Sequence, residues 1–344
     1  AAAGTTAAVT RAAATTAEPS PTAEAMPYRW MLPPGFPAPV VPAGNPMTQA
    51  KVDLGRLLFF DTRLSLNGAY SCASCHRPEL AFTDGRIRSV GATGGVLMRQ
   101  SMTLLNVAYA VSFGWTRNAA TSLESQMLTP LFNRHPVELG LTGRVQPLLA
   151  ALAADPRVAA AFARAYPRAP RPRLRQVIDS IASFERTLIG GRSAFDRYIF
   201  DDDTAALTSA AKHGMELFFG RLGCSGCHFG LNLGGPAHIA GKPRPAPLFA
   251  ATGTGGRFKV PSLRNVALTA PYMHDGRYED LAAVIDHYQH VRRGLRPGEE
   301  PDERLQDIHL EAGESAELIE FLRALSDPPW PPPPPRSLES RWSW

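Results

Sequence analysis

The chain has 344 residues, of which 44% are apolar and 19% are charged, so it is long enough for two globular domains with cores of their own. The formal net charge is +5 and the basic residues are scattered, so the charge pattern does not indicate a nucleic-acid partner. No stretch contains the roughly 18 consecutive apolar residues of a membrane-spanning helix. Proline is abundant, with 32 residues, which predicts long ordered loops.

The N-terminal residues 1–46 are expected to lie outside the first domain. About the first 25 are rich in Ala, Thr and Pro, a composition typical of disorder. They lack the charged and apolar regions of a signal peptide, as in an exported chain whose signal peptide has been removed. Residues 26–46 are rich in proline and carry Tyr28, Trp30 and Phe36, so we expect an extended segment that these rings anchor to the body.

A first domain is predicted over residues 47–204. Its first helix starts after Thr48, a residue type that caps helices, and ends near Asp61. A glycine-rich loop is expected over 77–105. Apolar spacing predicts further helices over 123–132, 145–152, 158–166 and 174–188, and Gly190–Gly191 is expected to end the last of them. The acidic run 201–203 marks the boundary to the next domain.

A second domain is predicted over residues 205–327. Thr208 caps a helix that runs through Phe218, a long loop covers 229–258, and helices follow over 281–288 and 315–325. Residues 328–344 form a proline-rich tail. Both halves have the order helix, Cys-x-x-Cys-His motif, long loop, helix, and no alternating strand pattern persists. We therefore predict an all-α fold produced by duplication.

The two Cys-x-x-Cys-His motifs use all four cysteines of the chain. This spacing is the attachment signature of c-type haem, because two thiols on one turn can add to the haem vinyl groups while the adjacent histidine binds the iron. Zinc would require the ligands to cluster, whereas the motifs lie about 150 residues apart, and a redox Cys-x-x-Cys would require a βαβ context. A disulfide in each motif is the other alternative.

We favour two covalent haems, and hence two cytochrome c-like haem domains with long ordered loops. Because haem c is attached on the outer side of the bacterial inner membrane, we expect a periplasmic protein. The attaching thiols are Cys72, Cys75, Cys224 and Cys227, and the expected iron ligands are His76 and His228.

The sixth position of each iron decides its reactivity. A haem with two strong ligands transfers electrons, whereas one with an open position can bind peroxide. No histidine lies between His76 and His135, and Met98 and Met102 are the other candidate ligands in that stretch. We therefore favour an open iron at His76.

Four stretches carry a resemblance to a known family. They are Leu57–Asp61, Thr103–Asn106, the stretch from Trp115 to Glu138, and Lys259–Gly276, which is the most specific of the four. Across roughly residues 47–326 the chain resembles the bacterial di-haem cytochrome c peroxidase and MauG superfamily. The resemblance implies an oxidoreductase that uses hydrogen peroxide.

The resemblance also implies roles for the residues around the first haem. The haem on His76 would react with peroxide, in a distal pocket formed by Gln126, Pro130 and Glu138. Glu138 would move the proton during O–O cleavage and Gln126 would hydrogen-bond the bound peroxide. Without the resemblance, the composition alone would favour a surface position for both side chains.

Between the haems, the resemblance implies an electron relay and a metal site. Trp115 would carry electrons from one haem to the other. The side chain of Asn106 and the backbone carbonyls of Thr269 and Pro271 would hold one calcium ion, a hard cation that prefers oxygen ligands.

The second haem distinguishes branches of the superfamily. Its sixth ligand is methionine in the electron-accepting peroxidases and tyrosine in the MauG branch, and the matching residue here is Tyr288. A thioether favours Fe(II), whereas a phenolate stabilises Fe(III) and Fe(IV), so the resemblance implies a bis-Fe(IV) state. Rival ligands are Met273, His274, His287 and His290.

The oxidised substrate follows from the branch. MauG acts through a surface tryptophan two residues before its second motif, and Leu222 takes that place here, so the methylamine dehydrogenase precursor is not expected as substrate. The stretch 27–37 and the insert after Leu231 resemble the MbnH group of copper and methanobactin operons, which convert a tryptophan of a partner protein to kynurenine. We predict peroxide-driven oxidation of a Trp or Tyr of a periplasmic partner.

Two alternatives stay open at this point. The first is a conventional di-haem peroxidase that takes electrons from a small cytochrome or cupredoxin. The second is a non-enzymatic di-haem electron carrier, which would have two six-coordinate haems.

Overall fold

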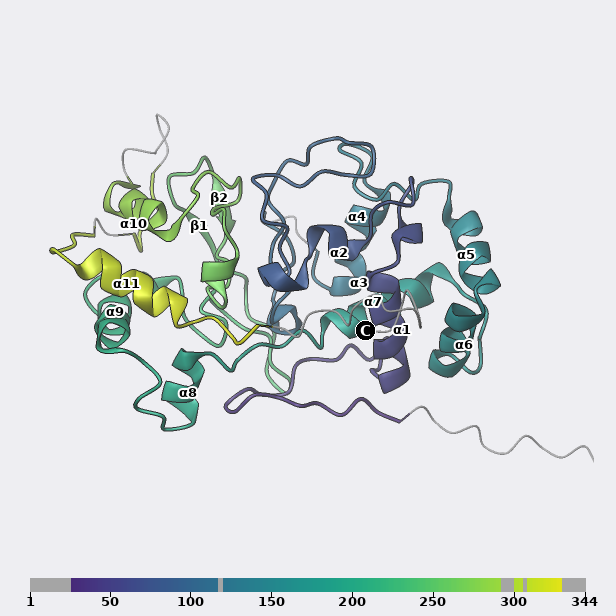
Figure 1. Ribbon diagram of the computed structural model, residues 1–344, viewed down its shortest axis with the longest axis horizontal. Coiled ribbons are helices and arrows are strands. Elements are labelled where there is room, and N and C mark those ends of the chain that lie inside the picture. The colour runs from purple at the N-terminus through teal and green to yellow at the C-terminus, as the bar shows by residue number, and fades with distance from the viewer. Residues whose placement is uncertain (1–25, 117–119, 292–299, 306–307, 330–344) are drawn as a thin grey trace, which may run out of the picture.

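The computed structural model describes residues 26–116, 120–291, 300–305 and 308–329. Two bodies lie side by side, one from the N-terminal half of the chain and one from the C-terminal half (Figure 1). Each has its own cluster of buried apolar side chains, the first between residues 47 and 188 and the second between residues 195 and 325. Among the helices of the described ranges, none has the length and apolar character to span a bilayer. Most of the predicted tail, 330–344, and residues 1–25 lie outside the described residues.

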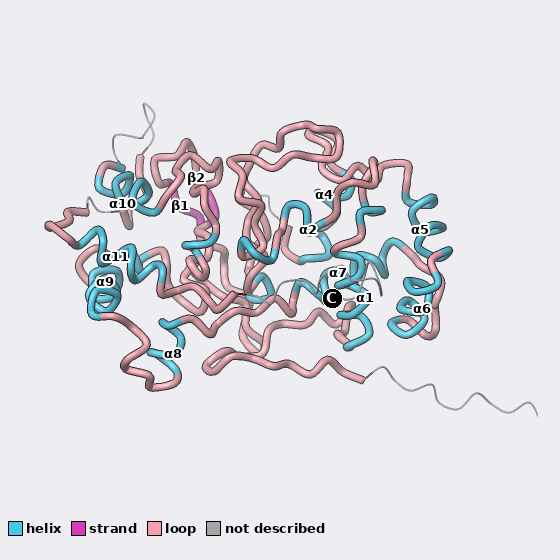
Figure 2. The backbone as a smooth tube through the Cα atoms, viewed as in Figure 1, coloured by secondary structure: helices cyan, strands magenta, loops and turns pink. Residues whose placement is uncertain are grey.

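The first body is helical, with long loops between short helices (Figure 2). The predicted helix over 123–132 is divided at Met127 into two short helices. A helix before the acidic run, α8, was not predicted. The helices are α1 (Gln49–Phe59), α2 (Cys72–Cys75), α3 (Leu123–Gln126), α4 (Leu128–Phe132), α5 (Val145–Ala154), α6 (Pro156–Ala165), α7 (Leu174–Glu185) and α8 (Ala194–Phe200), with 3-10 turns η1 (Thr62–Leu64), η2 (Pro78–Leu80) and η3 (Val107–Tyr109).

The second body is also mainly helical. Its helices are α9 (Ser209–Phe219), α10 (Leu281–Gln289) and α11 (Glu314–Arg323), with 3-10 turns η4 (Cys224–Gly226) and η5 (Val266–Leu268). The segment expected to be loop contains one exception to the all-α prediction, a small antiparallel sheet of β1 (Phe249–Ala251) and β2 (Arg257–Lys259). Three-residue strands are too short to produce an alternating sequence pattern, which is why the sheet was not predicted.

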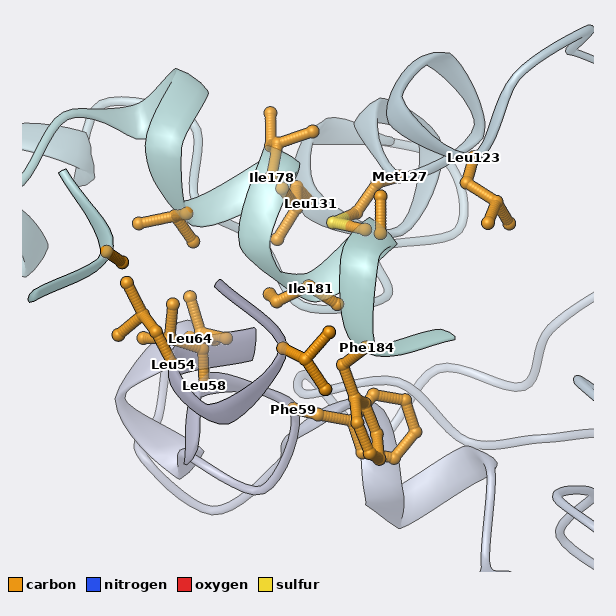
Figure 3. Packing of buried hydrophobic residues seen from close by; sticks show 14 of the residues in the cluster. Leu54, Leu58, Phe59, Leu64, Leu123, Met127, Leu131, Ile178, Ile181 and Phe184 are labelled. Atoms are coloured by element: carbon orange, nitrogen blue, oxygen red, sulfur yellow. The ribbon is translucent and has the colours of Figure 1, made fainter. Parts of the chain in front are cut away.

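Helix α1 packs closely against α7 in the first core. Figure 3 shows Leu58 and Phe59 of α1 beside Ile181 and Phe184 of α7. The approach is close because a Cβ at Gly55 would lie 1.8 Å from the backbone oxygen of Ser180, so only glycine fits there. As predicted, Thr48 caps α1 by accepting a hydrogen bond from a backbone N–H.

The second core repeats this arrangement with α9 and α11. A Cβ at Gly214 of α9 would lie 2.0 Å from the backbone oxygen of Glu317 on α11. Thr208 caps α9 as predicted. In both halves the glycine is followed by a Leu-Phe-Phe sequence, at 58–60 and 217–219, so the duplication is visible in structure and sequence together.

The predicted end of α7 at Gly190–Gly191 is wrong, because the helix ends at Glu185. The two glycines allow close approach instead. A Cβ at Gly190 would lie 2.2 Å from a carboxylate oxygen of Asp327, and one at Gly191 would lie 2.4 Å from the ring of Phe36. The Asp327 carboxylate accepts the backbone N–H of Gly191, so this loop joins the end of the described chain to the first body.

The segment 26–46 lies along one edge of the molecule and reaches from α1 to α8 (Figure 1). The ring of Phe36 is buried and contacts the rings of Tyr109 and Phe200 edge to face. Tyr28 and Trp30 pack partly against the first core. The expectation of an extended, ring-anchored segment is confirmed for these three aromatic residues.

Candidate functional site

A single cavity of about 650 Å³ connects the two Cys-x-x-Cys-His motifs. Its wall includes every residue that the sequence analysis favoured for a site, but not the rival ligands His287 and His290, together with apolar side chains of both cores. These residues are Cys72, Cys75, His76, Asn106, Trp115, Gln126, Pro130, Glu138, Cys224, Cys227, His228, Thr269, Pro271 and Tyr288. Segments from all parts of the chain therefore converge on one space between the two bodies.

Both motif histidines are oriented in the same way. Nδ1 of His76 lies 2.9 Å from the backbone oxygen of Phe82, and Nδ1 of His228 lies 2.9 Å from that of Leu233. Because a carbonyl only accepts, Nδ1 carries the proton in each ring and Nε2 keeps a lone pair for a metal. Burial lowers the pKa of both imidazoles, which favours this neutral form.

The carbonyl that orients each histidine belongs to a residue with left-handed backbone. Phe82 has φ 61° and Leu233 has φ 47°, values that are uncommon for residues other than glycine. The same unusual conformation at the same place in both halves indicates that the histidine orientation is built into the fold.

The four cysteines do not form disulfides, which removes that alternative. Burial raises the pKa of the Cys75 and Cys224 thiols to about 11, so neither is a ready thiolate for zinc. No group of three or more Cys, His, Asp or Glu side chains within the described ranges gathers to hold a metal ion. Paired thiols, a bare Nε2 and a shared apolar cavity fit one covalently attached haem on each motif.

On the first side of the cavity, Glu138 is a half-buried carboxyl near the first motif. Burial raises its pKa, and a hydrogen bond from Asn133 opposes that effect. The loop that covers it requires glycine, because a Cβ at Gly91 would lie 1.9 Å from the backbone oxygen of Val137. Gln126 and Pro130 line the same part of the cavity from α3 and α4.

Other candidate ligands of the first haem also line the cavity. His135 is exposed and lies at the cavity wall three residues before Glu138. It is therefore a further candidate ligand of the first haem, which was not predicted from the sequence. The backbone carbonyl of Met102 raises the pKa of the His76 imidazole, which places Met102 on the histidine side. The Met98 side chain is largely exposed.

On the second side, Tyr288 lines the cavity from α10. No described residue hydrogen-bonds to its phenol. Burial and the nearby Cys224 and Cys227 raise the pKa of the Tyr288 phenol. The phenol therefore keeps its proton unless the oxygen binds a metal ion, which displaces the proton. Among the rivals, Met273 and His274 also line the cavity. The His274 ring is stacked on Phe258, with centroids 3.7 Å apart.

His287, the neighbour of Tyr288, is turned away from the cavity. Its Nε2 lies 2.6 Å from the backbone oxygen of Thr252, and its Nδ1 lies 2.9 Å from the phenol oxygen of Tyr278. Both ring nitrogens therefore have partners within the protein, which leaves neither for an iron.

Trp115 lies where the two bodies meet. Its indole Nε1 donates to the backbone oxygen of Gln100, 2.9 Å away, and its own backbone oxygen accepts from Lys259 in β2. Its ring is 6.4 Å from that of His274. Trp115 is thus held from both halves, through its indole on one side and its backbone on the other.

Some of the oxygens predicted to bind calcium already accept hydrogen bonds within the protein. Oδ1 of Asn106 accepts the backbone N–H of Gly190, while Nδ2 is buried without a partner. The backbone oxygen of Pro271 accepts from the Gln100 side chain. Each of these oxygens has a second lone pair that could bind a cation while the hydrogen bond is kept. Calcium takes six to eight oxygen ligands, so waters would have to complete the set.

Two ionisable cavity residues were not predicted from the sequence. Lys259 faces the cavity without an acidic partner among the described residues, and burial lowers its pKa to about 8. Burial raises the pKa of Glu185, next to Cys72, to about 8. Neither position has a local sequence signal, because their burial depends on chain segments that are remote in sequence.

Comparisons with known proteins agree with this geometry. The family described as di-haem cytochrome c peroxidase matches residues 49–204. The methylamine utilization protein MauG of Methylorubrum extorquens is 35% identical over 303 residues, which cover 84% of this chain and 81% of that protein. The cytochrome c551 peroxidase of Pseudomonas aeruginosa is 34% identical over 257 residues, 70% of this chain and 72% of that protein.

A solved structure has a similar fold. The crystal structure of a MauG-like protein associated with microbial copper homeostasis has a TM-score of 0.80 and 34% sequence identity, and the match covers 87% of this chain and 96% of that one. The di-haem peroxidase BthA of Burkholderia thailandensis, at 20% identity and a TM-score of 0.62, shares the fold.

Proposed function

Because the chain belongs to the di-haem cytochrome c peroxidase and MauG family, and is therefore a peroxide-dependent di-haem oxidoreductase, we propose that it oxidises aromatic residues of a partner protein. The family implies two haem c groups. When bound, they supply the redox chemistry: one hydrogen peroxide accepts two electrons and two protons and gives two waters. The residues of the chain bind, orient and move protons around that reaction.

Glu138 is the proton carrier in this proposal. Its raised pKa, caused by burial, suits a carboxyl that takes a proton from the proximal oxygen of peroxide and returns it to the leaving oxygen. The Gln126 amide would hold peroxide in place, and Pro130 would limit the space for water. This assignment rests on the shared position of the three residues at the cavity wall.

The observation that carries the proposal is the position of Tyr288. It faces the cavity, whereas both nitrogens of its rival His287 are hydrogen-bonded within the protein. A phenolate ligand stabilises oxidised iron, so a tyrosine at this position favours storage of oxidising equivalents over uptake of donor electrons. Trp115, held between the two bodies, would connect the two haem sites.

We also propose a periplasmic location, a tryptophan as the oxidised residue and a partner related to copper. The last point is supported by a solved MauG-like structure associated with copper homeostasis. Calcium at Asn106, Thr269 and Pro271 is part of the proposal. A chelator is expected to lower the rate of electron transfer between the haems without releasing them, because the thioether bonds are covalent.

A peroxide titration of the fully oxidised protein, without any electron donor, tests the proposal. We expect the optical spectrum to change with one equivalent of peroxide, and mass spectrometry to find kynurenine in a tryptophan-containing partner. If the spectrum changes only after a donor reduces one haem, and turnover follows with a small cytochrome, the conventional peroxidase reading is correct instead. The relative from Pseudomonas aeruginosa is a peroxidase of that kind by name.

A further inference from the structure

Tyr278 forms a hydrogen-bonded pair with His287 behind the second haem site. The Nε2 atom of His287 lies 2.6 Å from the backbone oxygen of Thr252, which can only accept, so Nε2 carries the ring proton. The Nδ1 atom is then a bare acceptor. The phenol of Tyr278, 2.9 Å away, must therefore donate its proton toward Nδ1.

The same residues form a continuous row of rings. The rings of Tyr288 and His287 have centroids 5.4 Å apart, and those of His287 and Tyr278 are 5.3 Å apart. Tyr288 lines the cavity, whereas Tyr278 is partly exposed and lies between the exposed residues Arg277 and Glu279. The row thus leads from the cavity wall to the surface.

Two other tyrosines, one from each body, lack this chemistry. The phenol of Tyr272 donates to the backbone oxygen of Val266, and that of Tyr109 donates to the backbone oxygen of Pro37. A carbonyl oxygen is a far weaker base than the bare nitrogen of a neutral imidazole, and of these three phenols only that of Tyr278 donates to such a nitrogen. Removing an electron from a phenol is easiest when its proton has a base to move to, and Tyr278 meets that condition.

The second half has no aromatic side chain at the position from which MauG passes oxidising equivalents to its substrate. Leu222 stands where the resemblance to MauG places a surface tryptophan, and its side chain is aliphatic and only 6% exposed. An oxidising equivalent stored at the second site therefore requires another way out.

We propose that Tyr278 is the residue through which oxidising equivalents leave the second haem site, an inference that rests on the proposed function. One electron passes from Tyr278 to the second site, which peroxide has oxidised. The phenolic O–H bond breaks and its proton moves to Nδ1 of His287, which leaves a neutral tyrosyl radical. An electron from an aromatic residue of the partner then restores Tyr278, and the proton returns from His287.

The neighbouring charges are compatible with this step. Arg277 hydrogen-bonds to Tyr278, and its guanidinium is paired with the carboxylate of Asp275 at 2.7 Å. The positive charge next to the phenol is therefore balanced by a fixed negative one.

The experiment is electron paramagnetic resonance of the holoprotein, frozen within milliseconds to seconds after peroxide is added without a partner. We expect a tyrosyl radical in the wild type, no tyrosyl radical in Tyr278→Phe, and an unchanged radical in the control Tyr272→Phe. The optical signature of the oxidised haems should form in all three proteins and last longer in Tyr278→Phe, because its exit is blocked.

A labelling measurement covers the case in which Tyr278→Phe does not fold. In wild-type protein with ring-deuterated tyrosine, the part of the hyperfine splitting that comes from ring protons should collapse, and transfer to D2O should alter the coupling from the proton on His287. A radical that persists in Tyr278→Phe, or haem oxidation without any tyrosyl radical, overturns the inference and leaves the proposed function intact. If peroxide does not oxidise the haems at all, the proposed function and the inference both fail.

Discussion

The two halves of the molecule prepare their haem sites with the same local devices. In each, a helix with a contact glycine, Gly55 or Gly214, leads to a Cys-x-x-Cys-His motif. In each, the motif histidine is oriented by the carbonyl of a left-handed residue. Asn106 and Asn265 then precede equivalent 3-10 turns with φ of 58° and 60°. These local devices around the motifs are therefore the part of the fold that the two halves share.

The halves differ in the polar side chains that each presents to the shared cavity. The first presents Gln126, an amide from α3, and Glu138, a carboxyl with a raised pKa that follows α4. The second presents a phenol, Tyr288, from α10. In the proposed function, reactivity is set by these few side chains, which lie outside the repeated devices, and they distinguish a peroxide site from a storage site.

The largest expected effect comes from replacing Glu138, the carboxyl at the first haem site. Glu138→Gln keeps the size of the side chain and removes its ability to carry a proton, so the rate of reaction with peroxide should fall about 10²- to 10⁴-fold. Stopped-flow spectroscopy measures this rate. The matched control is Glu79→Gln, an exposed carboxylate near the same motif that pairs with Arg77. Equal rates in both variants would show that Glu138 does not move the proton.

Substitution of Gly55 and Gly214 tests whether the close helix packing stabilises the two halves equally. Gly55→Ala and Gly214→Ala each place a Cβ about 2 Å from a backbone oxygen of the opposing helix. Each should lower the free energy of unfolding by about 1–3 kcal/mol, because the helices must move apart. Gly44→Ala is the control, since its Cβ would meet only the far end of the Arg175 side chain, 3.9 Å away. Denaturant unfolding measures the three values, and an effect in one half alone would break the equivalence.

A pH-dependent effect on stability is expected from Glu185, a buried acid of the first half. Its pKa is raised by burial from 4.5 to about 8, so the folded protein holds a proton that the unfolded chain releases in this range. The free energy of unfolding should therefore decrease as pH rises from about 4.5 to 8, by at most about 1.4 kcal/mol per pH unit. Glu185→Gln should remove this contribution in denaturant titrations at several pH values. The same slope in both proteins would contradict it.

Local sequence signals predicted the parts of the fold that depend on local structure. Thr48 and Thr208 cap their helices as expected, and α10 begins and ends within a residue of its prediction. The role of Gly190 was predicted wrongly, because it is set by Asp327, which is remote in sequence. The small sheet was missed because its strands have three residues each.

The site could be predicted only where a motif or a resemblance supplied the residues. The cysteines and histidines of the two motifs were evident from spacing alone. The hydrogen bonds of His287 to Tyr278 and Thr252 could not be predicted from the sequence, because nothing in it indicates that Thr252 and α10 lie together. The position of Lys259 beside Trp115 of the first body was likewise not evident from the sequence.

The difference between the two haem sites is tested most directly by low-temperature electron paramagnetic resonance of the fully oxidised protein, before any peroxide is added. We predict one high-spin signal, from an open iron at His76, and one low-spin signal, from an iron bound by His228 and Tyr288. In Tyr288→Phe the low-spin signal alone should change. Two low-spin signals of equal weight in the wild type, or a low-spin signal that Tyr288→Phe leaves unchanged, would contradict the account.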